Sequence, residues 1–176
     1  MSKSSTNRPV KYAQPTLASE PVEVDPDAKG TPIRWALGVE ALLNIVGGTW
    51  MVFWPAQFLR LVVPKPSDVT PAAMISVQHY GGLVYALTVP IILAIPNTRR
   101  AIESRISTYY LLGSAEIAII CLSLYQAYGP AGGTGFTTNS LASASAGVAP
   151  VFLWRLFVLF RKPEWLGRYR EKLKGS

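Results

Sequence analysis

The sequence predicts an all-α integral membrane protein, folded as a four-helix bundle with the N- and C-termini on the cytoplasmic side. About half of the 176 residues are apolar and only 15% are charged, against roughly 25% in a typical soluble domain. Four apolar segments each reach the length of about 20 residues that a helix needs to cross a bilayer. These segments are residues 33–54, 72–95, 107–128 and 141–160.

The distribution of basic residues predicts the orientation. With four crossings, the N-terminal tail, the loop between the second and third segments and the C-terminal tail share one side, which holds fourteen Lys and Arg residues. The opposite side holds only Arg60 and Lys65. Because positively charged loops stay in the cytoplasm, both termini are expected there. The same asymmetry accounts for the net charge of +7, so we infer no nucleic-acid partner.

Two tails flank the transmembrane domain, which we place at residues 32–160. Residues 1–31 are polar and rich in Pro and Ser, a composition that predicts a disordered cytoplasmic tail. Residues 161–176 form a basic, amphipathic tail, for which we expect a short helix on the membrane surface. The alternative is a solvated tail that only fixes the topology. The apolar side chains of the expected helix are Trp165, Leu166, Tyr169 and Leu173.

Four ionisable residues within the spans are the candidates for chemistry. Charged side chains at mid-depth cost at least roughly 2.5 kcal/mol, and they usually face the bundle interior and serve a function. At 1.5 Å per residue, Glu40 and Arg155 lie at similar depths, about 8–10 Å from the cytoplasmic side. They are therefore candidates for a structural ion pair, although Arg155 could instead extend to the interface. The other two are His79 and Glu116.

The remaining polar residues give each candidate a structural and a functional interpretation. Glu116 and Asn44 both fall near mid-membrane, so they could form an interhelical hydrogen bond or line a pocket in which Glu116 exchanges a proton. His79 and Gln78 lie nearer the outer surface, where they could either join helices or face the same pocket. One His and one Cys cannot supply a usual zinc site, so we infer neither a metal nor another cofactor.

Helical spacing places several of these residues on inward-facing stripes. We expect an intramembrane pocket for a lipophilic small molecule, with Asn44, Gln78, Tyr85 and Trp154 as its binding residues. An acid, a base and aromatic walls could move a proton on an apolar molecule. The hypothetical catalytic residues are Glu116, His79 and Glu40.

The chain resembles the small four-helix membrane proteins of the DoxX-like type. The features are the first segment GVEALLNIVGGTWMVFW, Pro55 soon after it, the GGL step in the second segment and the Leu-Leu-Gly entry to the third. The mixture of Glu, His, Asn and Trp, and the ending APVFLWRLFVLFRKPEWLGRYREKLK, are similar to the EXPERA group of sterol isomerases and sterol-binding proteins. This resemblance implies a bundle that handles a lipophilic molecule, and it assigns no residue.

The sequence therefore predicts a multi-pass membrane protein, either an isomerase, cyclase or other membrane-pathway enzyme, or a non-catalytic accessory or scaffold subunit. A transporter would have to oligomerise, because four helices are few and no inverted repeat is visible. The expected partners are membrane lipids, a lipophilic small molecule and another membrane protein. The expected location is an endomembrane, with the endoplasmic reticulum favoured.

Overall fold

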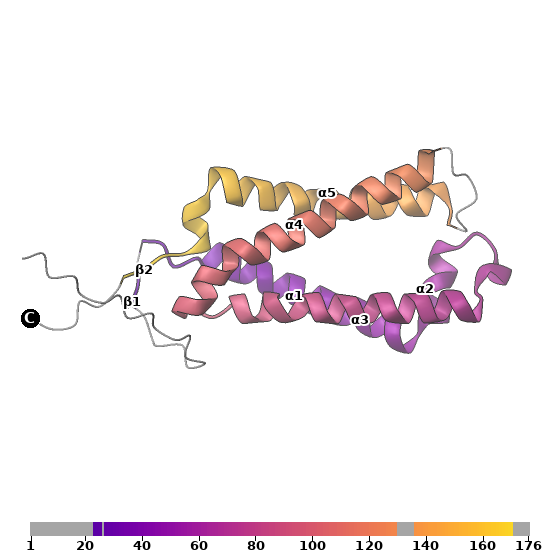
Figure 1. Cartoon of the computed structure of the whole chain (residues 1–176), viewed down its shortest axis with the longest axis horizontal. Helices are drawn as coiled ribbons and strands as arrows, with labels where there is room; N and C mark the ends of the chain where they lie inside the picture. Colours follow the sequence, from indigo (N-terminus) through magenta and orange to yellow (C-terminus); the bar gives the residue numbers. More distant parts are fainter. Residues whose placement is uncertain (1–22, 26, 130–135, 171–176) are drawn as a thin grey trace, which may run out of the picture.

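The protein is a bundle of four long apolar helices, as the sequence predicts (Figure 1). The computed structural model describes residues 23–25, 27–129 and 136–170. All four helices are long and apolar enough to cross a membrane, so the chain is a multi-pass membrane protein. The helices are α1 (Thr31–Phe53), α3 (Pro71–Ala94), α4 (Arg99–Tyr128) and α5 (Thr138–Arg161).

Helix α4 begins eight residues before the predicted start of the third span, at Arg99 instead of residue 107. The Thr98 hydroxyl caps this start by accepting a hydrogen bond from the backbone N–H of Ala101 at 3.3 Å, a contact that stabilises helix N-termini. The charged first turns lower the local hydropathy, which is why the apolar pattern begins later. As a result, Arg105 is part of a transmembrane helix and not of a loop.

The short elements lie at the two ends of the bundle. The helix α2 (Pro55–Val62) follows α1 directly, and the 3₁₀ turn η1 (Pro66–Asp68) leads to α3. At the other end lie the 3₁₀ turn η2 (Pro163–Leu166) and the strands β1 (Glu23–Val24) and β2 (Tyr169–Arg170), which pair antiparallel. We call this second end the basic end, because the described basic residues gather there, among them Lys29, Arg99, Arg161 and Lys162.

The segment after α5 differs from the expected surface helix. Residues 163–166 form η2, and Gly167 has a φ of 93°, a left-handed conformation that suits glycine and ends the turn. Trp165 instead packs on Trp154, with ring centroids 5.6 Å apart, and Leu166 is buried. Residues 23–25 and 27–30 of the expected disordered tail form β1 and the approach to α1, whereas residues 1–22, 26 and 171–176 lie outside the described residues.

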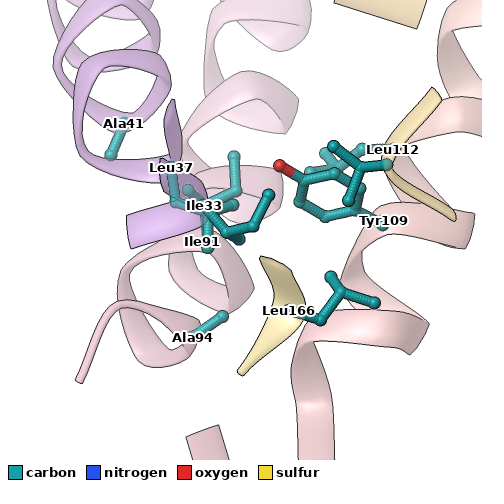
Figure 2. Close-up of a cluster of buried hydrophobic side chains, with 9 residues drawn as sticks. Ile33, Leu37, Ala41, Ile91, Ala94, Tyr109, Leu112 and Leu166 are labelled. Atoms are coloured by element: carbon teal, nitrogen blue, oxygen red, sulfur yellow. The ribbon is translucent and has the colours of Figure 1, made fainter. Parts of the chain in front are cut away.

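The bundle consists of two helix pairs, α1 with α3 and α4 with α5 (Figure 1). The pairs meet near the basic end around a hydrophobic cluster and diverge toward the α2 end. There α2 reaches the second pair, because the carbonyl oxygen of Val62 accepts a hydrogen bond from the Ser140 hydroxyl at 3.0 Å. The cluster, most of which Figure 2 labels, contains Ile33, Leu37, Ala41, Ile91, Ala94, Tyr109, Leu112, Val158 and Leu166.

Two glycines, Gly48 on α1 and Gly81 on α3, set how closely these helices pack. A Cβ atom added at Gly81 would lie 2.9 Å from the Met51 Cβ and 3.1 Å from the Gly48 carbonyl oxygen. Small residues at such a crossing let helix backbones approach closely within a membrane. A Cβ atom at the neighbouring Gly82 would meet nothing within 4 Å. The crossing therefore turns the Gly81 side of α3 toward α1.

Candidate functional site

A charged cluster joins three helices within the bundle, and Arg155 on α5 is its centre. The Arg155 Nε lies 2.9 Å from each carboxylate oxygen of Glu116 on α4. Its Nη2 donates to Oε1 of Glu40 on α1. The three residues, which we call the Glu–Arg–Glu cluster, therefore tie the first helix pair to the second.

The ring of Tyr109 packs against the guanidinium of Arg155. The Arg155 Cζ lies 5.0 Å from the centroid of the buried Tyr109 ring, close enough for a cation–π interaction. One turn further along α4, Gly113 lies beside the arginine stem, where a Cβ atom would make an ordinary contact with Arg155 Cδ at 3.8 Å. The indole N–H of Trp154 is buried near the Tyr109 phenol but outside hydrogen-bond geometry.

The burial of the cluster is uneven. Only 1% of the Arg155 side chain is exposed, whereas 21% of Glu40 and 14% of Glu116 are exposed. A buried guanidinium needs such partners, because removing a charge from water costs several kcal/mol unless it is paired. The carboxylates therefore neutralise the arginine and also present the accessible edge of the cluster.

The structure brings together three of the four ionisable residues that the sequence singles out. Glu40 and Arg155 form an ion pair. Glu116 bonds to Arg155 and not to Asn44, since the long arginine side chain reaches it from a shallower level of α5. Asn44 is half-buried one turn after Glu40, and it makes none of the hydrogen bonds of the cluster.

His79 does not lie in the cluster. Its side chain is exposed, and its Nδ1 lies 2.9 Å from the carbonyl oxygen of Ile75, one turn earlier in the same helix. His79 therefore does not lie beside Glu116, and its hydrogen bond stays within α3 instead of joining two helices. The reason is the rotation of α3. Gly81 faces α1, and His79 lies two residues earlier, which corresponds to about 200° around the helix and places it on the opposite side.

Two further predicted binding residues join α1 to α3, on the same side of α3 as Gly81. The Gln78 amide donates to the carbonyl oxygen of Val52 at 3.0 Å, which belongs to the last turn of α1, where carbonyls lack helical partners. The Tyr85 hydroxyl lies 2.5 Å from the Thr49 hydroxyl. Both contacts belong to the α1–α3 crossing, away from the Glu–Arg–Glu cluster.

A second buried arginine organises the basic end, and the sequence reasoning missed it. Arg105 is fully buried and donates to the carbonyl oxygens of Ala94 at 2.9 Å and Leu166 at 2.7 Å. It thereby caps α3 and holds the segment after α5. Its remaining acceptors are the carbonyl oxygens of Ile95 and Pro96 and the side-chain oxygen of Asn97.

The spacing along α4 could have revealed Arg105. Arg105, Tyr109, Leu112 and Glu116 follow the i, i+4, i+7, i+11 pattern of one helical face. Counting Arg105 as a loop charge hid this pattern. Nearby, the Tyr169 hydroxyl donates to the Glu103 carboxylate, a hydrogen bond that raises the pKa of Tyr169.

An open groove of about 390 Å³ lies on the other half of α1, toward α2. Its walls contain none of the ionisable residues discussed above. The groove therefore offers apolar and uncharged polar side chains but no ionisable group. The groove is lined by Ile45, Val46, Thr49, Trp50, Trp54 and Gln57.

The fold and the cluster define a class of protein, a multi-pass four-helix membrane protein with an ion-pair cluster inside its bundle. Comparisons with protein-family models, with curated proteins and with solved structures find no match to this chain.

Proposed function

We propose that the protein binds a lipophilic small molecule whose polar end reaches the Glu–Arg–Glu cluster. The observation that carries this proposal is the uneven burial of the cluster. The guanidinium of Arg155 is enclosed, while both carboxylates keep exposed surface inside a membrane-spanning bundle. Ionisable groups at membrane depth are costly, and they mark ligand or proton sites by default.

The surroundings of the cluster favour an apolar molecule. The exposed neighbours of Glu40 on α1 include Val39 and Leu43, and Ile117 beside Glu116 is also exposed. A molecule that approaches the carboxylates from the bilayer therefore meets apolar side chains before it meets charge. Ligand sites commonly combine such apolar walls with a few polar groups that fix the ligand's orientation.

In the catalytic form of this proposal, Glu40 or Glu116 exchanges a proton with the bound molecule, as an isomerase or a cyclase requires. General acid–base catalysis needs a carboxyl group within hydrogen-bond reach of the reacting atom. The exposed edges of the two glutamates support this role, and Arg155 would stabilise the carboxylate form. His79 has no part in it, because its side chain points away from the cluster.

The test is mass spectrometry of the molecules that co-purify with the full chain in mild detergent. We expect one lipophilic species to be enriched with the wild-type protein and reduced about tenfold with Glu116→Gln, which keeps the shape but loses the charge. The matched control is Glu103→Gln, an exposed glutamate on the same helix, which should retain the species. The same bulk membrane lipids in all three samples would overturn the proposal.

An accessory role is the second candidate, and a different observation favours it. Cβ atoms added at Gly38, Gly47, Gly82 or Gly147 would meet nothing within 4 Å, so these small residues leave room on the helix surfaces. Such surfaces allow another membrane helix to pack closely. The same purification separates the two functions, because an accessory subunit would retain a stoichiometric protein partner in place of a lipophilic species.

A further inference from the structure

The Glu–Arg–Glu cluster has an excess of negative charge. It combines two carboxyl groups with one guanidinium, and Arg155 is the one cation that contacts either glutamate among the described residues. The nearest arginines along the chain serve another purpose, because Arg34 and Arg105 donate to backbone carbonyls at the end of α3. With all three groups ionised, the cluster therefore has a net charge of −1.

The accessible edge of the cluster consists mainly of acceptors, because the carboxylates are 21% and 14% exposed and the Arg155 side chain only 1%. Nε and Nη2 of Arg155 are engaged by the two carboxylates, and Nη1 belongs to a side chain that is almost entirely enclosed. One oxygen of Glu40 accepts no hydrogen bond from the part of the chain that the structure describes, although a carboxylate can accept about four. A ligand that approaches the accessible edge therefore meets acceptors first.

The guanidinium is closed to an anionic ligand. Arg155 is fully buried, and Tyr109 lies against its face. A carboxylate or phosphate group could reach Arg155 only by entering the enclosed space around its remaining N–H groups or by displacing Glu40 or Glu116. It would also add a second uncompensated negative charge in a region of low dielectric, where unpaired charges are costly.

Resting on the proposed function, we infer that the site takes an amphiphile whose polar end is a hydrogen-bond donor, with a protonated amine preferred. An ammonium group would donate to the free carboxylate oxygen and bring the net charge of the cluster to zero. A hydroxyl group would supply the donor without the charge, so it should bind more weakly. A carboxylate head supplies neither and should be excluded.

The experiment measures equilibrium binding of radiolabelled dodecylamine, dodecanol and dodecanoate to the purified full chain in a neutral detergent at neutral pH. The three probes share one tail, so differences in affinity report the head group. We expect dodecylamine to bind about tenfold or more tightly than the other two. Glu40→Gln should weaken amine binding by a similar factor and leave dodecanol nearly unchanged, while the Glu103→Gln control binds as the wild type.

The possible results separate the two proposals. Dodecanoate that binds as tightly as dodecylamine would overturn the inferred head-group preference and leave the proposed function standing. A loss of dodecanol binding equal to the loss of amine binding in Glu40→Gln would overturn it as well. Absence of saturable binding by all three probes would overturn the proposed function itself. If Glu40→Gln does not fold, Glu116→Gln provides the same comparison from the other carboxylate.

Discussion

Replacing Arg155 by Met should lower the free energy of unfolding by about 3–5 kcal/mol, because it leaves two carboxyl groups near each other without their common partner. The methionine side chain fills part of the space on Tyr109, so the loss would reflect charge more than volume. The measurement is unfolding of the purified protein in mild detergent with increasing denaturing detergent. The loss should be largest at a pH at which the glutamates are ionised.

Arg161→Met is the matched control, because Arg161 is an exposed arginine at the end of the same helix. Its effect should stay within about 0.5 kcal/mol, as is usual for surface substitutions. Adding Glu40→Gln to Arg155→Met should recover part of the lost stability, since residues in one charged network are not additive. Equal stability of Arg155→Met and Arg161→Met would show that the cluster does not hold the helix pairs together.

Replacing Arg105 by Met should lower the free energy of unfolding by about 3 kcal/mol or more, because each buried carbonyl left without a donor costs roughly 1–3 kcal/mol. Arg105 donates to acceptors at the end of α3 and to Leu166. Gly30 and Gly167 enclose it, since a Cβ atom at either position would lie 2.5–2.6 Å from Arg105 Nη1. Because Arg34 also donates to the Ile95 carbonyl oxygen, the loss should arise mainly from the carbonyls of Ala94, Pro96 and Leu166.

Hydrogen exchange would locate the effect of the Arg105 substitution. Backbone amides in residues 163–170 should exchange faster in Arg105→Met, because the segment loses its hydrogen bond to α4. Arg100→Met, an exposed position on the same helix, should change neither the stability nor the exchange. Unchanged exchange in residues 163–170 of Arg105→Met would contradict the assigned role of Arg105.

The four spans could be predicted because length and hydropathy are local properties of each segment. The proximity of Glu40 and Arg155 also followed from local information, their similar depths in the bundle. The bond between Arg155 and Glu116 could not, because it depends on how α4 and α5 are positioned and on the reach of a long side chain. The start of α4 was missed because charged residues occupy its first turns.

The orientation of His79 and the structure of the C-terminal tail depend on contacts distant in sequence. Composition cannot decide whether Gly81 or Gly82 packs against α1, yet this choice turns His79 outward. The amphipathic pattern after Pro163 was compatible with a helix. The chain instead bends at Gly167 and pairs with residues 23–24, an interaction between segments more than a hundred residues apart.

The most direct test of the central claim is photo-crosslinking with an aliphatic amine that has a diazirine near its head group, followed by peptide mass spectrometry. We expect adducts on α1, α4 and α5 around Glu40, Glu116 and Arg155, and we expect them to be lost when unlabelled dodecylamine competes. Adducts confined to the groove near Trp50 and Trp54, or labelling that dodecylamine does not reduce, would contradict a binding site at the Glu–Arg–Glu cluster.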